Sequence, residues 1–439
     1  MKKITFLLVF IVLCNILSAQ NDTLKLSLNK AIEIGISNRF DIKANDISIS
    51  IAENTLVKSK RELIPDISAG GKLTYYCQLQ PTIIPAGTLG FTDQKKLAMG
   101  MKNNTAFSLD LNYTVFSPGL YTNIKISSNN LELEKERNIF TLTNIKIEIA
   151  EAYENVLLKS IQYQIARSNE NRYKNYYNLI NGKYTNGILL ESDLLLAELD
   201  YKNAIANSEK IKQNYQLSLQ NLKYHINLSD TTIVLVTDSL QISNSDLNSD
   251  FKKKSGINRS ELKQLQIEQH GYELQLNKAM QYYLPSISFF ANYSDLFQGN
   301  KFEYSSNFNW APVNYAGLKI SIPLTGNINN IISVKDCRLK LTQIDLKQKQ
   351  KAADIKYEIV DAKTKLNNAI QNLNVAKDNY TLSQKVYVLK QQQYNLGSFS
   401  YEQLLDTEKS LNNAEQEYIT SVYNYLIAKI YYKKAFGEF

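Results

Sequence analysis

Side chains suited to bond-making chemistry are few in this sequence, and their spacing forms no familiar catalytic or metal-binding motif. The only two histidines, His225 and His270, lie in helical patterns without a cysteine or another histidine at metal-ligand spacing. The sequence contains no phosphate-binding loop and no nucleophile elbow. Surface positions are the ordinary expectation for such histidines. We therefore expect no enzyme activity, no cofactor and no metal site.

Polar groups suited to reversible hydrogen bonding are concentrated in two segments that match at a constant shift of 210 residues. Segment 184–204 aligns with segment 394–414, and each begins with the pattern Y-x-x-G. The glycines, Gly187 and Gly397, are suited to a tight turn because glycine adopts left-handed backbone conformations freely. Long helical patterns flank both segments. The sequence therefore predicts two helix–helix turns in equivalent positions.

The composition favours an exported protein with long regular elements. Only 16 Gly and 7 Pro interrupt 439 residues, and the mean hydropathy of −0.31 excludes a polytopic helical membrane protein. Residues 1–19 have the form of a signal peptide: Lys2 and Lys3, an apolar stretch, and small residues before a cleavage site after Ala19. An N-terminal membrane anchor is the alternative, but the apolar stretch is short for a span. The formal charge of +8 is spread along the helices, so no nucleic-acid partner is expected.

Helical periodicity accounts for most of the chain. Helices are predicted over residues 24–63, 120–182, 257–283 and 327–396. After a turn, the second of these is followed by a returning helix that ends at residue 228, and the last is followed by one that runs through 404 to 435. Each of the two long helices has a stripe of residues at alternating spacings of four and three, the spacing of a coiled-coil seam, with many Ala, Tyr, Ser and Lys among them. The first seam consists of Ile145, Ile149, Ala152, Val156, Lys159, Tyr163, Ala166, Glu170, Tyr173, Tyr177, Ile180 and Tyr184, and each member of the second seam lies 210 residues later.

Four stretches instead alternate polar and apolar residues with a period of two, which is typical of strands with one apolar face. These are residues 67–75, 105–116, 287–293 and 316–324. A run of about 9–11 residues spans a bilayer as a tilted strand. Residues 78–104 are predicted to be a loop because they contain two prolines and several glycines.

The order of these elements predicts an internal duplication. Residues 20–228 form the first structural repeat, with a helix, two strands and a long helical hairpin. Residues 229–255 form an irregular equatorial linker with one short β-like run, and residues 256–439 form the second structural repeat.

Four such strands cannot lie alone in a bilayer, because the backbone groups at their edges would stay unpaired in lipid. Closure therefore requires strands from other chains, and three copies would give twelve strands. Oligomerisation follows from this argument, whereas the number three does not. Helices of about 60 residues reach ~90 Å, enough to cross much of the periplasm.

The chain resembles the TolC-like outer membrane factor family over nearly its whole length. Three features carry the resemblance: the opening stretch Leu26, Leu28, Ala31, Ile32, Gly35, Ile36 and Asn38, the Leu63-Ile64-Pro65 motif before the first strand, and both Y-x-x-G turns. The resemblance implies an α+β membrane protein: a trimeric 12-stranded outer-membrane β-barrel, four strands per chain, continuous with a periplasmic α-helical barrel.

The implied function is that of an exit duct of an efflux or type I secretion system. The implied partners are two further copies of the chain, a periplasmic adaptor protein, an inner-membrane pump and outer-membrane lipid. The alternative is a structural or adhesive coiled-coil outer-membrane protein without transport activity. The four alternating strands and the duplicated turns favour the duct.

In this family the turns close the periplasmic end of the tunnel. By position in the motif, Tyr394 resembles the tip tyrosine, and Ser192 and Asp193 resemble its partners on the other hairpin. A hydrogen bond from Tyr394 to Asp193 is thus a candidate lock of the aperture, with packing in the seam as the alternative role of Tyr394.

Two departures distinguish this chain from the familiar gate. Phe399 stands where an arginine forms a salt bridge, and Gln403 and Asp406 stand where two acids face inward. Symmetric copies of Asp406 would still form an acidic ring that favours cations, unless Asp406 is simply a solvated helix residue. The turn residues implied in adaptor docking are Tyr184, Gly187, Gly397, Ser398 and Phe399.

Overall fold

A computed structural model describes residues 24–238, 259–323 and 328–438. The predicted signal peptide, residues 239–255 of the predicted linker and the end of the fourth predicted strand at residue 324 lie outside these ranges. The chain divides into two compact units. The helical unit comprises Met1–Ile47, Glu136–Gln264 and Gln348–Phe439 as far as they are described, and the sheet unit comprises Ser48–Lys135 and Leu265–Lys347.

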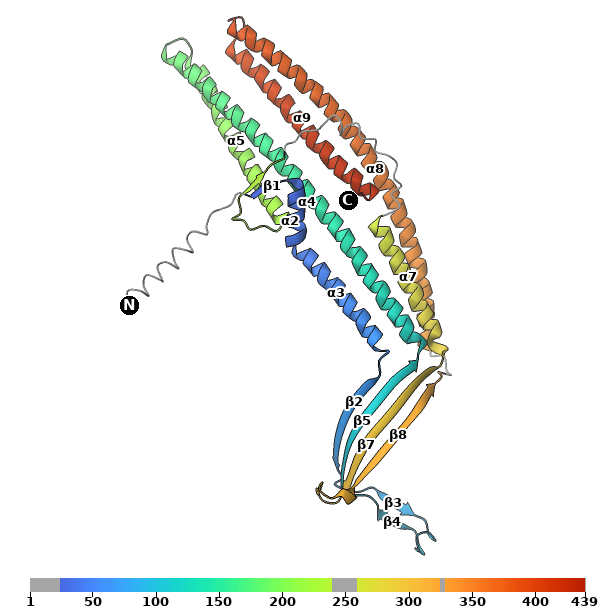
Figure 1. Cartoon of the computed structure of the whole chain (residues 1–439). Helices are drawn as coiled ribbons and strands as arrows, with labels where there is room; N and C mark the ends of the chain where they lie inside the picture. The colour runs from blue at the N-terminus through green and yellow to red at the C-terminus, as the bar shows by residue number, and fades with distance from the viewer. Residues whose placement is uncertain (1–23, 239–258, 324–327, 439) are drawn as a thin grey trace, which may run out of the picture. The chain divides into compact units, whose positions relative to one another are not determined.

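The sheet unit contains the four predicted strands as one antiparallel sheet. They are β2 (Asp66–Tyr75), β5 (Asn103–Phe116), β7 (Ser286–Gly299) and β8 (Trp310–Ser321). The strands lie side by side in the order β2-β5-β7-β8 (Figure 1). β2 and β8 are therefore the two edges of an open sheet, and nearly all of their residues are exposed.

The two faces of this sheet differ in chemistry, as the period-two alternation predicts. On one face Leu109 lies opposite Ala69 on β2 and Tyr293 on β7. On the other face the carboxylate of Asp110 accepts hydrogen bonds from Ser108 Oγ at 2.9 Å and Asn292 Nδ2 at 2.7 Å. Among the described residues this apolar face is exposed: the most exposed of its large side chains are Ile67, Leu73, Leu318 and Ile320, each more than 60% exposed.

The predicted loop at residues 78–104 contains structure that the sequence analysis missed. β3 (Pro81–Ile84) and β4 (Lys95–Ala98) pair as an antiparallel hairpin, and β5 already begins at Asn103. Proline is compatible with the first residue of a strand, and the three residues that follow Pro81 are β-branched, so a strand can form there despite two nearby prolines.

The single helix predicted over residues 24–63 was wrong, because the segment forms three elements. They are β1 (Leu24–Leu26), α2 (Leu28–Asn38) and α3 (Phe40–Arg61). The hydroxyl of Ser27 accepts a hydrogen bond from Lys30 N at 3.4 Å and caps the start of α2. Arg39 has an extended backbone with ψ of 133°, which separates α2 from α3.

The predicted linker is only partly irregular. β6 (Val234–Val236) pairs in parallel with β1. Both strands contribute to a buried apolar cluster that also contains Ala31 from α2 and Ile149 and Val156 from the long helix α4 (Pro118–Thr185). The paired strands β1 and β6 are thus packed against α4.

The predicted helical hairpins are confirmed. They are α4 (Pro118–Thr185) with α5 (Glu191–His225), and α8 (Ile328–Asn395) with α9 (Tyr401–Phe436) (Figure 1). α4 and α8 each have 68 residues, and their bounds differ by 210 residues. Every residue of the two predicted seams is buried or half-buried except Tyr184. The remaining helix, α7 (Ser260–Met280), ends in a short 3-10 turn (Gln281–Tyr283).

None of the described helices is both long and apolar enough to cross a membrane.

Arg39 joins α4 to the C-terminal end of α5 in the first hairpin. The Arg39 guanidinium contacts Asp41 at 2.6 Å and Glu148 on α4 at 3.1 Å, and donates a hydrogen bond to the backbone oxygen of His225 at 3.3 Å. His225 is the last residue of α5, so the cation lies where helix carbonyl groups lack partners. The hydrogen bonds from Arg39 lower the pKa of Asp41.

A second arginine makes the same set of contacts at the other hairpin. Arg259 contacts Glu261, Glu358 on α8 at 2.9 Å and the backbone oxygen of Ala435 at the end of α9 at 3.2 Å. Its acceptors on α8 and α9 lie 210 residues after those on α4 and α5. The sequence analysis named neither arginine, although both stand two residues before an acid.

A buried carboxyl group on α4 has an oxygen atom without a hydrogen bond. Glu154 is 8% exposed, and its Oε2 atom has no hydrogen-bond partner among the described residues. The nearby carboxylate of Asp238 accepts hydrogen bonds from Tyr153 Oη and Leu28 N, both at 2.9 Å. Burial and the negative charge of Asp238 raise the pKa of Glu154 to about 7.

This raised pKa predicts a pH-dependent stability. Glu154 binds its proton more tightly in the folded chain, so its contribution is complete at low pH and is lost as the pH rises from about 4.5 to about 7. Glu154→Gln should therefore stabilise the fold at pH 8, by on the order of 3 kcal/mol at most, and leave stability unchanged at pH 4.5. Thermal unfolding in detergent at both pH values measures this. The exposed Glu33→Gln is the control, and an equal effect of Glu154→Gln at both pH values would contradict the assignment.

Candidate functional site at the hairpin tips

The two predicted turns have the same backbone geometry. Gly187 and Gly397 adopt φ of 73° and 74°. In the first turn, Gly187 N donates to Tyr184 O at 2.8 Å and Ile188 N donates to Lys183 O at 2.9 Å. The second turn repeats both bonds with Gly397 at 2.9 Å and Ser398 at 3.0 Å. This is a Schellman helix end, and it explains why glycine stands three residues after tyrosine.

The returning helices begin with side-chain caps that differ. Ser400 Oγ accepts from Gln403 N at 3.2 Å, and Gln403 Oε1 accepts from Ser400 N at 3.1 Å, which makes a complete capping box. In the first hairpin Asp193 Oδ2 accepts from Leu190 N at 3.3 Å. Leu190 has no acceptor on its side chain, so only half of the box exists there. Asp193 and Gln403 thus each have a structural role in one chain.

The predicted lock residues do not meet within one chain. Among the described residues, no hydrogen bond joins Tyr394 to Asp193. Tyr394 is half-buried, and its ring lies edge-on to that of Tyr401 at 5.6 Å. Ser192 and Asp406 are exposed. The lock and the acidic ring therefore stay predictions.

The remaining tip residues are largely exposed. Tyr184 is 37% exposed, and a Cβ added to Gly187 or Gly397 would meet nothing within 4 Å. Ser398 Oγ donates to the backbone oxygen of Gln393 at 2.9 Å. Phe399, which replaces the familiar arginine, lies under the ammonium group of Lys390 at 4.5 Å from the ring centroid. A cation still lies beside this position, but it comes from α8.

The structure adds a polar contact between the two hairpins that the sequence analysis missed. Arg172 on α4 forms an ion pair with Glu408 on α9 at 3.0 Å, and both side chains are less than a quarter exposed. Burial raises the pKa of Glu408, although the charge of Arg172 opposes this effect. Deeper along the same contact, Leu158, Ile165 and Ile419 form an apolar cluster.

Further pairs extend this contact along α4 and α9. Asn412 Nδ2 donates to Asn169 Oδ1 at 2.9 Å, and the rings of Tyr176 and Tyr401 stack at 5.4 Å. Burial raises the pKa values of both tyrosines. A second stripe on α4, with members spaced by three and four residues, could have indicated this face in the sequence.

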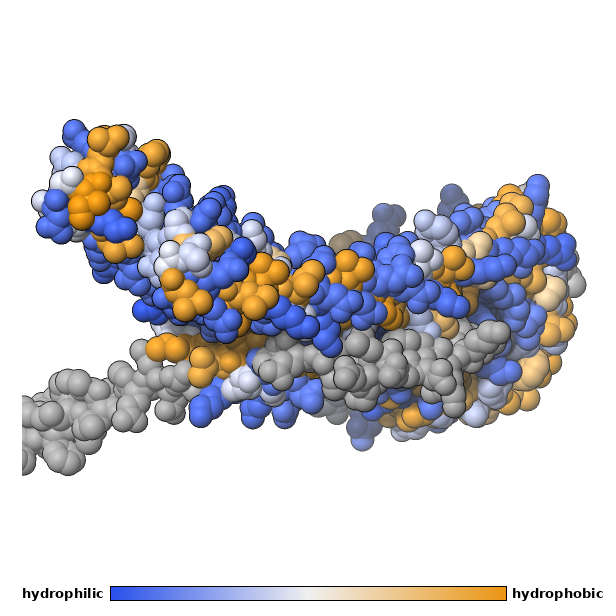
Figure 2. Space-filling view, turned by 90° about the horizontal axis from the view of Figure 1, so that it is seen from above, coloured by the Kyte–Doolittle hydropathy of each residue, from blue (hydrophilic) through white to orange (hydrophobic). Residues whose placement is uncertain are grey.

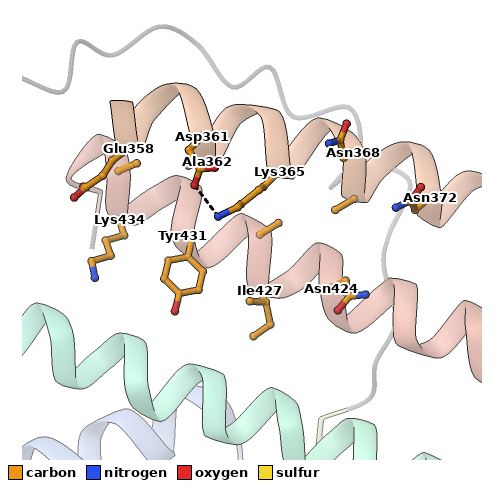
Figure 3. A pocket seen from close by; sticks show the side chains of 13 residues that line it. Glu358, Asp361, Ala362, Lys365, Asn368, Asn372, Asn424, Ile427, Tyr431 and Lys434 are labelled. Atoms are coloured by element: carbon orange, nitrogen blue, oxygen red, sulfur yellow. Dashed lines mark ion pairs between the residues drawn. The ribbon is translucent and has the colours of Figure 1, made fainter. Parts of the chain in front are cut away.

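A groove of about 620 Å³ lies between α8 and α9 of the second hairpin (Figure 3). Alanines such as Ala362 and Ala428 leave room for it, and Lys365 lies at its rim in an ion pair with Asp361 at 2.7 Å. On the first hairpin, Ala152, 210 residues before Ala362, belongs to the cluster covered by β1 and α2.

Large apolar side chains are exposed on the chain as a whole, including many on the helices. On the face shown in Figure 2 they are interspersed with hydrophilic residues. Among the described residues, no group of three or more His, Cys, Asp or Glu side chains could hold a metal ion. The described tips offer contact surfaces and hydrogen-bonding groups.

This combination of an open four-stranded sheet and two long helical hairpins is the fold of outer-membrane channels. The chain is similar to CusC (TM-score 0.73, 15% identity, 94% of this chain and 92% of that chain) and to the outer membrane channel CmeC of Campylobacter jejuni (TM-score 0.73, 15% identity, 94% and 85%). It is also similar to the outer membrane protein VceC of Vibrio cholerae (TM-score 0.72, 14% identity, 93% and 96%). No protein-family model and no curated protein matches the sequence. The resemblance to TolC-like outer membrane factors is thus confirmed at the level of the fold.

The tip geometry makes a prediction about its glycines. Gly397→Ala should destabilise the turn by about 1–2 kcal/mol, because a Cβ is unfavourable at positive φ even in open space. Hydrogen exchange of tip amides should then become roughly five- to thirtyfold faster. Gly182→Ala is the matched control: this glycine lies inside α4 with open space around it, so exchange should slow or stay unchanged. Equal effects of the two substitutions would contradict the turn assignment.

Proposed function

We propose that this protein is an outer-membrane exit duct of an efflux or type I secretion system. One observation carries the proposal: the four-stranded sheet has an exposed apolar face, and its edge strands β2 and β8 have no further partner strand among the described residues. Such a sheet is costly in water because of its apolar face and costly in lipid because of its edges. The fold shared with CusC, CmeC and VceC supports the same conclusion.

Closure of the sheet by other copies of the chain removes both costs. Pairing of β2 of one copy with β8 of the next leaves no edge, and three copies give a barrel of twelve strands with the apolar face toward lipid. The polar face, with Asp110 and Asn292, then lines a water-filled lumen. The resemblance implies that the number of copies is three, a homotrimer.

The helical hairpins of the three copies then form a periplasmic tunnel. Internal duplication gives each copy two equivalent hairpins. Two observations support the duplication: the bounds of α4 and α8 differ by 210 residues, and Arg39 and Arg259 make corresponding contacts. The tips lie at the end that faces the cell interior. There they dock a periplasmic adaptor linked to an inner-membrane pump, which delivers the substrate.

Conductance and mass test the duct directly. The purified protein in detergent should have the mass of three chains, and it should form ion-conducting channels in planar lipid bilayers. A non-conducting monomer would overturn the proposal, and a non-conducting oligomer would favour the structural coiled-coil alternative.

The aperture at the tips is held by weak polar links. We place the hydrogen bond from Tyr394 to Asp193 there, with Ser192 and Gln403 beside it and copies of Asp406 as an acidic ring. Exposed hydrogen bonds suit a gate because their net contribution is only about 1 kcal/mol each and partners can replace them. Tyr184, Gly187, Gly397, Ser398 and Phe399 form the adaptor-docking tips.

The lock predicts a specific effect of one hydroxyl group. Tyr394→Phe should raise the resting conductance at least twofold, because the ring stays while the hydrogen bond to Asp193 is lost. Tyr184→Phe is the matched control at the equivalent turn position, and it should leave conductance unchanged. Single-channel recording measures both. If Tyr394→Phe also has no effect, Tyr394 serves only in packing.

A further inference from the structure

We propose that a groove between the end of α7 and the start of α8 binds an anionic phospholipid from the membrane leaflet that faces the periplasm. The inference rests on the proposed function, in which the apolar face of the sheet lies in the outer membrane. Two basic side chains of the groove hold the lipid phosphate, and its apolar side chains contact the acyl chains.

The groove has a volume of about 520 Å³ and lies where α7 and α8 meet the sheet. α7 leads through the 3-10 turn into β7, and β8 leads into α8, so both helices adjoin the end of the sheet opposite to the β3–β4 hairpin. The lining combines apolar, aromatic and basic side chains: Met280, Tyr283, Ile331, Val334, Lys335 and Arg338.

The apolar part of the groove continues the apolar face of the sheet. On β8 this face contains the alternate residues Leu318 and Ile320, and Ile322 follows in the same alternation at 55% exposure. Beyond the strand, Ile331 on α8 and Met280 on α7 are 60% and 46% exposed. Exposed apolar side chains at this level are suited to contact with the acyl chains that surround the sheet.

The basic part of the groove is placed to reach lipid phosphates. Lys335 and Arg338 lie about 10 and 15 Å from the start of α8, at 1.5 Å per residue. Helix side chains tilt toward the N-terminus, which in α8 is the end next to the sheet. Long basic side chains can therefore extend their charges to the headgroup layer, which adds about 5–8 Å to each side of the hydrocarbon core. Tyr283 adds an aromatic ring with a hydroxyl group, a side chain typical of membrane interfaces.

The two cations are available to an anion. Both are exposed, and neither forms an ion pair with a described residue. The neighbouring stretches 274–294 and 310–335 contain three lysines and no acid. Asp336, the nearest acid on α8, is exposed and does not line the groove. A lysine and an arginine beside apolar surface form a pattern that recognises the phosphate of an anionic lipid.

A second hollow at this end of the sheet has a different charge balance. Its volume is about 950 Å³, and Asn112 from the polar face of the sheet belongs to its lining. It carries two basic side chains, Lys58 and Arg61, and two acidic ones, Glu62 and Asp66. Excess positive charge beside apolar surface thus distinguishes the α7–α8 groove from this hollow.

Lipid counting by native mass spectrometry tests the site in the full-length protein. Phosphatidylglycerol and phosphatidylcholine with the same acyl chains are added in detergent, and the protein should bind the anionic lipid at least fivefold more tightly. Lys335→Gln with Arg338→Gln should abolish this preference. Lys340→Gln with Lys347→Gln is the matched control, because it removes two exposed cations of α8 that do not line the groove, and it should leave the preference unchanged.

Two further arms separate the parts of the ligand. Ile331→Ser should weaken binding of both lipids, and a millimolar excess of inorganic phosphate should not displace phosphatidylglycerol. The proposal is overturned if the unaltered protein binds both lipids equally, if the Lys335 and Arg338 variant keeps its preference, or if free phosphate displaces the lipid. The first comparison needs no variant, so a misfolded variant leaves the test intact. A protein that selects phosphatidylglycerol but conducts no ions would refute the duct and not the lipid site.

Discussion

The pairing of backbone groups at the edges of the sheet is the constraint on which the rest of the account depends. β2 and β8 expose nearly all of their residues, and in the described part of the chain the large side chains of the apolar face between them are exposed as well. In lipid, unpaired N–H and C=O groups are too costly to persist, so an isolated sheet of this kind is unstable in a membrane. In the proposed assembly, association with further copies would pair the edges and turn the apolar face toward lipid.

Arginine contacts hold each long hairpin at its base. Arg39 and Arg259 each combine two carboxylates with a carbonyl group at the end of a return helix. The guanidinium fork suits this geometry because it donates several hydrogen bonds in one plane. Two related sites of this kind, one at each hairpin, are the strongest structural support for the proposed duplication.

Periodicity predicted the regular elements well because burial follows it directly. The alternation in segment 105–116 correctly predicted strand β5, and the alternating four- and three-residue spacing correctly predicted the buried seams of α4 and α8. The break at Arg39 was missed because no proline or glycine marks it, and the bend is held by tertiary contacts of the guanidinium. The β3–β4 hairpin was missed because Pro81 and Pro85 led to the prediction of a loop, although the residues between them are β-branched.

The candidate site was predictable in its backbone and less so in its contacts. The glycine spacing in Y-x-x-G indicated the turns, since positive φ is a local requirement. The Arg172–Glu408 contact joins residues 236 positions apart on different hairpins, so only the packing of α4 against α9 reveals it. The sequence shows that Phe399 cannot form the family's tip salt bridge, but it does not show that the ammonium group of Lys390, near the end of α8, lies over the Phe399 ring.

Electron cryomicroscopy of the protein in lipid nanodiscs tests the central claim most directly, because it shows what pairs with the edges of the sheet. The account predicts a closed ring in which β2 of each copy is hydrogen-bonded to β8 of the next, with twelve strands from three copies. An open four-stranded sheet, or a ring in which β2 and β8 remain unpaired, would contradict it.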